Sequence, residues 1–259
     1  MNPDTAQRLE QMGKELYQEE YTEAFVDRWD ELIDWQGRLK AEGTFFPDRL
    51  NEHNVKTVLD AACGTGFHTV TLAKAGFDVT GADGAQTMVD KAEENCKRFG
   101  VGDVPVVLGE WTTLSDAFPG QTFDAIVVLG NAFTHLFDEG DRKKALAEFY
   151  KLLNPGGVVV IDHRNYDSIL DEGYSTKHRY YYTGSNVEVF PEEASEEVVK
   201  MKYHYEDGSD YYLTMCPIRQ EYISGLLREA GFKNVERYGD FKKNYEFYDP
   251  DFIVQIAEK

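Results

Sequence analysis

The chain has 259 residues, and 47 acidic against 27 basic residues give it a formal net charge of −20 at pH 7. A surface with this charge repels nucleic-acid backbones and anionic membranes, so we expect neither as a partner. The length suits one large α/β domain. Three cysteines without paired spacing predict reduced thiols and no metal site, and the absence of a long apolar run predicts a cytoplasmic protein.

Residues 1–50 are predicted to be helical, because large apolar side chains recur there at helical spacing. These side chains are Tyr17, Tyr21, Phe25, Trp29, Leu32, Ile33 and Trp35. Such a stripe usually packs into a core. Because this segment precedes the first strand and has to lie over the sheet, it could also form a lid.

Residues 57–83 have the pattern of the opening βαβ unit of a nucleotide-binding domain. The first strand ends in Asp60, and two glycines, Gly64 and Gly66, predict a tight turn after it. A helix then leads to a second strand, which ends in Asp83. The order of strand, glycine turn, helix, strand and carboxylate predicts a nucleotide-like cofactor.

The same stretch favours S-adenosylmethionine over a dinucleotide. Thr69 stands where the dinucleotide fingerprint requires a third glycine. Asp60 places a carboxylate at the mouth of the loop, which opposes a pyrophosphate but suits a sulfonium and an ammonium group. Asp83 follows at the spacing of an acid that accepts hydrogen bonds from both ribose hydroxyls. An NAD-dependent oxidoreductase remains the alternative.

Strands and helices continue to alternate after residue 83, which predicts a doubly wound, mostly parallel, seven-stranded α/β sheet. The further strands are expected at Val104–Leu108, Phe123–Leu129, Val158–Asp162, Asn234–Tyr238 and Phe252–Ala257. One antiparallel strand is expected at the edge. Ligands bind such sheets at the carboxyl ends of the strands, where Glu110, Trp111, Asn131 and Arg164 fall.

Residues 165–215 interrupt the alternation. They are rich in tyrosine, and period-2 stretches at Val198–Tyr205 and Tyr211–Met215 predict an inserted antiparallel sheet on the active-site side. We therefore expect one domain over residues 1–259. Its parts are a helical lid (1–50), a cofactor-binding core (51–164), the inserted sheet (165–215) and the end of the core sheet (216–259).

With these residues assembled, the chain resembles the glycine/sarcosine N-methyltransferases, which are class I, Rossmann-like methyltransferases similar to animal glycine N-methyltransferases. The resemblance covers nearly the whole chain. It rests on Phe25-Val-Asp-Arg-Trp-Asp-Glu-Leu-Ile-Asp-Trp35, Val58-Leu-Asp-Ala-Ala-Cys-Gly-Thr-Gly66, Leu129-Gly-Asn-Ala-Phe-Thr-His-Leu-Phe137, Ile161-Asp-His-Arg-Asn-Tyr-Asp-Ser-Ile-Leu170 and Tyr238-Gly-Asp-Phe-Lys242. The glycine loop is common to class I methyltransferases, whereas the third and fourth segments are much more specific.

The resemblance implies two sets of site residues. The methyl donor would be bound by Tyr21, Trp29, Arg38, Ala62, Asp83, Glu110, Trp111 and Leu129. Among them, Arg38 would hold the donor's carboxylate, and Glu110 and Trp111 would take its adenine. The amino-acid acceptor would be held by Asn131 and Arg164, with Tyr182, Tyr212 and Tyr245 as weaker assignments.

One position departs from the resemblance. Relatives often carry a tyrosine immediately before Pro217, where this chain has Cys216. Tyr211 and Tyr212 are the candidates to supply the missing ring.

The implied reaction is an in-line displacement by a neutral amine, in which the protein mainly aligns two reactants. Arg164 suits a carboxylate because guanidinium binds it bidentately, although an ion pair with Asp162 or Asp167 is the structural alternative. Asn131 could orient the amine or simply form a turn. No residue has to act as a strong base. His135 and His163 are candidates, but each is better interpreted as a structural hydrogen-bonding residue.

The predicted function is therefore methylation of glycine to sarcosine and then to dimethylglycine, toward the osmolyte betaine. Within this class, the alternatives are an enzyme that also completes the third methylation and one that stops at the first. A non-catalytic sensor of the methyl donor is the alternative from another class. The sequence leaves open whether the chain is a monomer or a homo-oligomer.

Overall fold

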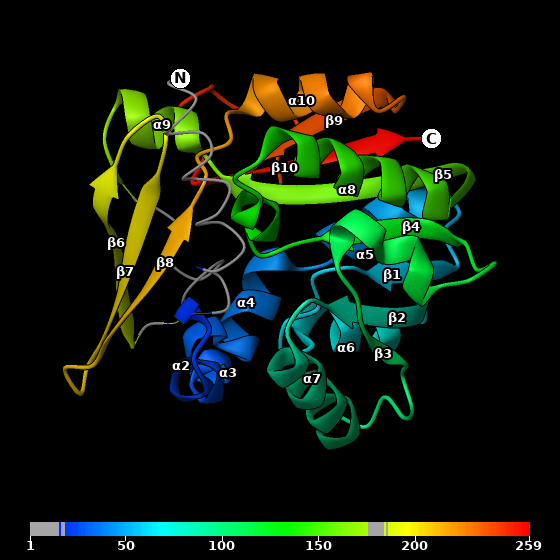
Figure 1. Ribbon diagram of the computed structural model, residues 1–259, viewed down its shortest axis with the longest axis horizontal. Coiled ribbons are helices and arrows are strands. Elements are labelled where there is room, and N and C mark those ends of the chain that lie inside the picture. The colour runs from blue at the N-terminus through cyan, green and yellow to red at the C-terminus, as the bar shows by residue number, and fades with distance from the viewer. Residues whose placement is uncertain (1–15, 17–18, 176–183, 185) are drawn as a thin grey trace.

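The computed structural model describes residue 16, residues 19–175, residue 184 and residues 186–259. Its centre is a seven-stranded sheet of order β3-β2-β1-β4-β5-β10-β9, and a three-stranded sheet of order β6-β7-β8 stands to its side (Figure 1). The strands are β1 (Thr57–Asp60), β2 (Asp78–Asp83), β3 (Val106–Leu108), β4 (Phe123–Val128), β5 (Leu153–Arg164), β6 (Val187–Ala194), β7 (Val199–Tyr205), β8 (Asp210–Met215), β9 (Lys233–Gly239) and β10 (Phe252–Glu258). This architecture confirms the predicted α/β sheet with its inserted antiparallel sheet.

The position of the antiparallel strand differs from the prediction. Strand β10 runs antiparallel to β5 and to β9 and lies between them, so the edge strand is β9. The reason lies in composition. Strand β10 is buried along nearly its whole length, whereas the polar β9 begins with two exposed residues, Lys233 and Asn234. A polar strand tolerates the edge of a sheet, and an apolar one does not.

Helices cover both faces of the central sheet. The core elements are α5 (Phe45–Glu52), α6 (Phe67–Lys74), α7 (Gln86–Arg98), α8 (Glu139–Leu152), α9 (Tyr166–Asp171) and α10 (Gln220–Glu229), with 3₁₀ turns η1 (Trp111–Ala117) and η2 (Ala132–His135). On β4, Ile126 and Val128 pack in the cluster that includes α8 and α10, whereas Ala125 and Val127 pack with α5 and α6. Both faces are covered, and β4 is therefore a continuous apolar run from Ala125 to Val128.

The described part of the N-terminal region is helical, as predicted, but it is broken into short helices. These are α2 (Glu23–Asp27), α3 (Trp29–Ile33) and α4 (Trp35–Glu42), which precede α5. The breaks have local causes. Asp34 between α3 and α4 is left-handed (φ 46°), and its side chain caps α4 by accepting from the Gly37 N–H. Gly43 ends α4 with a φ of 56°, a conformation that glycine adopts without strain.

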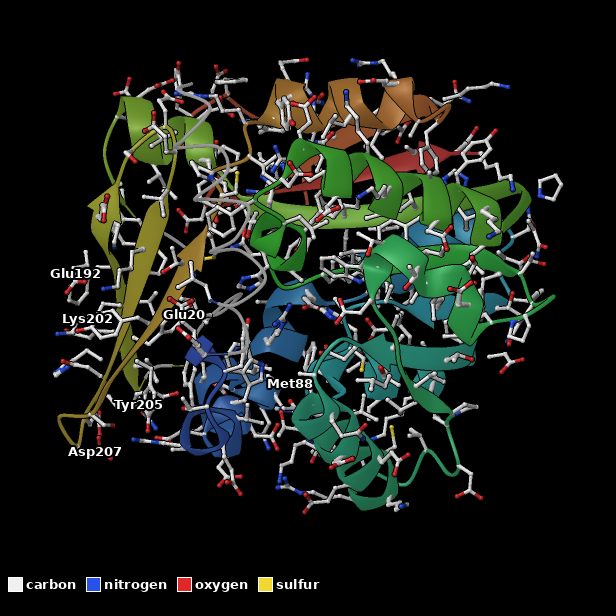
Figure 2. All side chains as sticks on the ribbon, viewed as in Figure 1. Glu20, Met88, Glu192, Lys202, Tyr205 and Asp207 are labelled. Carbon is white, nitrogen blue, oxygen red and sulfur yellow. The ribbon has the colours of Figure 1, made fainter. Side chains whose placement is uncertain are left out.

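The small sheet packs its inner face against these N-terminal helices. Tyr203 and Tyr205 of β7 are buried, while Lys202, which precedes Tyr203, points outward, as the alternation of a strand requires. The ring of Phe25 stacks on Tyr211 at 4.6 Å between centroids. Figure 2 shows Tyr205 near the N-terminal helices and Lys202 on the outer side of the sheet.

Strand β6 was not predicted, and its sequence explains why. It contains Pro191 and several glutamates, which are depleted in strands. Proline is tolerated here because β6 is an edge strand, paired only with β7 among the described strands.

Candidate active site

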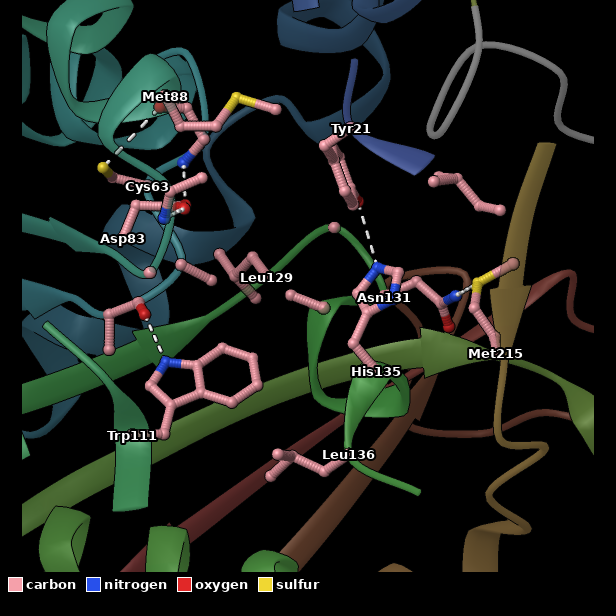
Figure 3. Close-up of a pocket in the computed structure, with 18 of the residues that line it drawn as sticks. Tyr21, Cys63, Asp83, Met88, Trp111, Leu129, Asn131, His135, Leu136 and Met215 are labelled. Carbon is pink, nitrogen blue, oxygen red and sulfur yellow. Dashed lines mark hydrogen bonds between the residues drawn. The ribbon is translucent and has the colours of Figure 1, made fainter. Parts of the chain in front are cut away.

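A cavity of about 450 Å³ opens at the carboxyl ends of β1, β2, β4 and β5, bordered by the N-terminal helices and the small sheet (Figure 3). It brings together all the donor-binding residues that the resemblance implies and two of the acceptor residues. They are Tyr21, Trp29, Arg38, Ala62, Asp83, Glu110, Trp111, Leu129, Asn131 and Arg164. Residues from distant parts of the chain therefore line one cavity of a size suited to small molecules.

The floor of the cavity is the glycine loop between β1 and α6. Gly64 and Gly66 have φ values of +52° and +92°, which side-chain-bearing residues rarely adopt. A Cβ at Gly66 would also lie only 3.2 Å from the Cα of Ala92 on α7. Both the backbone conformation and the close packing on α7 thus require glycine at position 66.

Asp83 ties this loop to the end of β2. Its Oδ2 accepts from the Gly64 N–H at 2.9 Å, and its Oδ1 accepts from the Ala85 N–H at 3.0 Å. Burial raises the pKa of Asp83 to about 6; the two backbone hydrogen bonds oppose this shift, and the charges of Asp60 and Glu110 add to it. A carboxylate in this position has the chemistry to accept hydrogen bonds from a pair of ribose hydroxyls.

Asp60 lies beneath the loop instead of at its mouth. It is fully buried, is not among the residues that line the cavity, and its Oδ2 accepts from the Thr69 hydroxyl at 2.7 Å. The sequence interpretation placed this carboxylate where it would meet a ligand, and the structure corrects it: Asp60 influences the cavity by charge and not by contact. Thr69, which replaces the third fingerprint glycine, is the partner that holds Asp60 there.

Trp111 and Met88 line the same side of the cavity as Asp83 (Figure 3). The indole N–H of Trp111 donates to the Ala61 carbonyl at 2.5 Å, which fixes the ring relative to β1. Glu110 precedes Trp111 and is exposed. An apolar wall with a carboxylate at its rim can hold a flat heteroaromatic ring that carries an amino group.

The N-terminal helices attach to the core beside this site. Arg38 is buried, and its Nε donates to Glu42 Oε1 at 2.8 Å, while His68 Nε2 lies 3.0 Å from the same oxygen. Burial disfavours the charged form of Glu42, but His68 and Arg38 together keep its pKa below the usual range. Tyr21 adds a second attachment, because its hydroxyl lies 3.0 Å from His135 Nε2.

Arg164 ends β5 and reaches the other side of the cavity. Its backbone N–H donates to Asn131 Oδ1 at 2.9 Å. The Asn131 Nδ2 donates to the Tyr166 hydroxyl at 2.9 Å and lies 2.7 Å from the Met215 sulfur. The amide of Asn131 is therefore engaged at both ends by protein groups, its oxygen by the Arg164 N–H and its nitrogen by the Tyr166 hydroxyl.

Tyr203 is a cavity residue that the sequence interpretation missed. Burial raises the pKa of its hydroxyl, and a hydrogen bond from Arg164 opposes that rise. Leu213 and Met215 of β8 line the same region. The signal was present as the period-2 pattern of β7, in which the buried Met201 and Tyr205 flank Tyr203 on the inner face.

Two other aromatic assignments, Tyr212 and Tyr245, are not among the residues that line the cavity. Tyr212 points to the outer face of the small sheet, where Lys200 Nζ stands 4.4 Å from its ring centroid. Tyr245 donates its hydroxyl hydrogen to Gln220 Oε1 at 3.0 Å and is not a lining residue. Tyr182 lies outside the described residues. Tyr211, the other candidate to replace a ring at Cys216, stacks on Phe25.

Neither histidine near the site is a strong base. Burial lowers the pKa of His135 to about 4, so this cavity residue is neutral near pH 7. His163 is fully buried behind Arg164, with Nδ1 at 2.8 Å from the Arg164 carbonyl oxygen, and burial lowers its pKa too.

Several further predictions can be compared with the described residues. Cys63, Cys96 and Cys216 are free thiols. Across the described part of the chain, no group of three or more His, Cys, Asp or Glu side chains is arranged to hold a metal ion. None of the helices in that same part combines the length and apolar character needed to cross a bilayer.

Comparison with known proteins agrees with this geometry. Residues 58–157 match the family model of a methyltransferase domain. The glycine/sarcosine N-methyltransferase of Halorhodospira halochloris is 50% identical over 94% of this chain and 90% of its own length. The glycine/sarcosine/dimethylglycine N-methyltransferase of Actinopolyspora halophila is 47% identical over 97% of this chain, which covers 44% of that longer protein.

The fold also matches solved structures. An S-adenosylmethionine-dependent methyltransferase from Clostridium acetobutylicum superimposes with a TM-score of 0.70 over 91% of this chain and 97% of its own. At 19% sequence identity, this likeness concerns the fold alone.

Proposed function

The chain belongs to the glycine/sarcosine N-methyltransferase family, and from this premise we propose that it transfers methyl groups from S-adenosylmethionine to the nitrogen of glycine and then of sarcosine. The observation that carries this proposal is that a buried guanidinium, Arg164, faces the same cavity as the glycine loop and Asp83. One cavity then has groups that can bind a nucleoside at one end and a small carboxylate at the other.

The residues present fit S-adenosylmethionine. Gly64 and Thr65 of the glycine loop line the cavity, Asp83 suits the ribose, and Trp111 with Glu110 suits the adenine. Arg38 faces the cavity from α4 and would hold the donor's carboxylate. Tyr21, Trp29, Ala62 and Leu129 complete the wall around its methionine part. When bound, the donor supplies an activated methyl group on a sulfonium.

Arg164 would hold the acceptor's carboxylate by two parallel hydrogen bonds, which fix both position and orientation. Asn131 contributes by setting the backbone at Arg164. Alignment of two reactants in this way can supply about 7–11 kcal/mol of the barrier. The chain's main contribution is thus to hold the amine in line with the methyl group.

The amine has to be neutral to attack. Of the two candidate histidines only His135 lines the cavity, and its pKa of about 4 makes it far weaker as a base than an amine. We infer that the amine reaches the site neutral or releases its proton to water. Ring faces of Tyr21 and Tyr203 in the cavity wall would stabilise the positive charge that moves from sulfur to nitrogen.

Product analysis tests the proposal. Glycine, sarcosine and dimethylglycine are offered separately with the methyl donor, and the products are identified by mass spectrometry. We expect methylated products from glycine and sarcosine, which would place the enzyme on the route to betaine. Tight donor binding in calorimetry without any product would contradict the proposal and favour a sensor of the donor.

A broader enzyme is the second candidate. The Actinopolyspora halophila relative, 47% identical, is named for dimethylglycine as well. Product from dimethylglycine at a rate similar to that from sarcosine would favour this reading. Product from glycine that stops at sarcosine would favour an enzyme of one step.

A further inference from the structure

The carboxylate of Asp30 joins several segments of the chain beside the cavity. It lies on α3 and is not among the residues that line the cavity. Its Oδ1 accepts from Thr65 Oγ1 at 2.9 Å and from the Trp35 indole N–H at 3.1 Å. Asn95 Nδ2 on α7 lies 3.2 and 3.1 Å from its two oxygens, and Arg98 stands 3.5 Å from Oδ2. A single acid thus receives hydrogen bonds from α4, the glycine loop and α7.

Two of these partners fix the glycine loop. Thr65 stands between Gly64 and Gly66, the two positions with positive φ, and its side chain is buried. Asn95 is fully buried and donates to the Thr65 carbonyl at 2.9 Å as well as to Asp30. The loop residue is therefore held through its main chain and its side chain at the same time.

Asp30 is also connected to the wall of the cavity. Its chain neighbour Trp29 lines the cavity, and the Trp29 indole nitrogen would lie 3.9 Å from a Cβ placed on Gly64. Because Trp29 and Asp30 are adjacent on α3, the hydrogen bonds of Asp30 hold the part of α3 that carries the indole against the loop and α7. The floor and one wall of the donor site are thereby held at a fixed separation.

We propose that Asp30 is a positioning residue for the methyl donor, because it fixes Trp29 relative to the Gly64–Gly66 loop. This inference rests on the proposed function, in that it concerns the donor site of the same cavity. It goes beyond the predicted site residues, since Asp30 acts through Trp29 and Thr65 and not by touching the donor. A carboxylate is needed because all of its neighbours are donors, and an amide would point N–H groups at some of them.

The alternative is that Asp30 only stabilises the packed N-terminal helices. The two roles differ in what they change. A purely structural residue would lower the melting temperature without altering the donor affinity of the folded protein. A positioning residue also weakens donor affinity, while the KM of the acceptor, measured at saturating donor, stays nearly constant.

The test uses the full-length chain with Asp30→Asn and, as a matched control, Asp27→Asn, an exposed acid on the neighbouring α2. Binding of S-adenosylmethionine and of S-adenosylhomocysteine is measured by calorimetry. We expect Asp30→Asn to raise both Kd values about tenfold, the effect of losing one charge-assisted hydrogen bond. Asp27→Asn should stay within about twofold of the wild type, the usual range for an isolated surface substitution.

Thr65→Val serves if Asp30→Asn does not fold, because it removes only the loop hydroxyl. It should raise the donor Kd about threefold, as expected for the loss of one neutral hydrogen bond. Donor affinity equal to the wild type in the folded variants would overturn the positioning role. A wild-type chain that fails to bind the donor would instead overturn the proposed function.

Discussion

The backbone N–H of Arg164 donates to the side-chain oxygen of Asn131 at 2.9 Å, which joins the end of β5 to the turn after β4. This bond links the residues that end two neighbouring parallel strands. Asn131 itself has a left-handed backbone (φ 65°), which asparagine tolerates better than most residues. Its amide also bonds Tyr166, so one side chain sets the geometry of the acceptor end.

Asn131→Ala should therefore impair both stability and activity. It leaves the Arg164 N–H and the Tyr166 hydroxyl without this partner, and an unsatisfied buried group costs about 1–3 kcal/mol. We expect a lower free energy of unfolding in urea and a loss of kcat/KM for glycine. An unchanged kcat/KM for glycine would contradict the positioning of Arg164 by this amide.

Donor affinity should depend on pH through Asp83. The pKa of this carboxyl is raised to about 6, and hydrogen bonds from the ribose hydroxyls would favour its charged form. A ligand that prefers the charged form binds less tightly once the group is protonated, so affinity should fall as pH falls through 6. Calorimetric Kd values between pH 5 and 8 measure this effect.

Asp83→Asn provides the control for that pH series. It removes the titrating group, so its weaker Kd should show no inflection near pH 6. If the inflection persisted in this variant, another group would be responsible.

Gly66→Ala should cost more stability than Gly120→Ala. Both glycines have positive φ, +92° and +74°, so both substitutions introduce backbone strain of about 1–3 kcal/mol. Only the Cβ at position 66 meets a neighbour, the α7 backbone at 3.2 Å, whereas nothing lies within 4 Å of the one at 120. Denaturant unfolding of the two variants should differ by about another 1 kcal/mol. Equal losses of unfolding free energy in the two variants would mean that the loop does not need this close approach to α7.

Two tyrosines on opposite faces of the small sheet form a matched pair. Tyr203→Leu removes a ring from the cavity wall and should lower kcat/KM for sarcosine about tenfold, since a cation–π contact with the charge that moves to the nitrogen contributes roughly 0.5–2 kcal/mol. Tyr212→Leu changes the outer face and should leave kcat/KM within about twofold, in line with the usual effect of surface substitutions. A larger loss of activity in Tyr212→Leu than in Tyr203→Leu would contradict the placement of the acceptor in the cavity.

The comparison of these tyrosines also shows how far the sequence can predict the site. Period-2 patterning predicts that β7 and β8 are strands, but it does not show which face of the sheet is buried. Tyr203 faces the cavity because β7 buries every second residue from Val199 to Tyr205. Which face of the sheet is buried depends on what packs against it, here Phe25 of α2.

Local sequence patterns were sufficient to predict the glycine loop but not the position of the neighbouring Asp60. Gly64 and Gly66 follow directly after a predicted strand, and both adopt the positive φ that a tight turn there requires. Buried Asp60 is bonded by the hydroxyl of Thr69, nine residues further along on α6, and such a bond cannot be read from a spacing pattern. Similarly, the place of β10 inside the sheet depends on pairing between segments that are far apart in the chain.

The central claim is that Arg164 binds the carboxylate of the acceptor, and Arg164→Ala tests it most directly. Radiomethyl transfer to glycine is measured together with donor binding by calorimetry, and Arg228→Ala, an exposed arginine on α10, is the control. Losing a buried charge pair of this kind costs about 2–5 kcal/mol, so kcat/KM for glycine should fall about 30-fold to several thousandfold. The donor Kd should stay within about twofold, like that of the control. Full glycine turnover in Arg164→Ala would contradict the account.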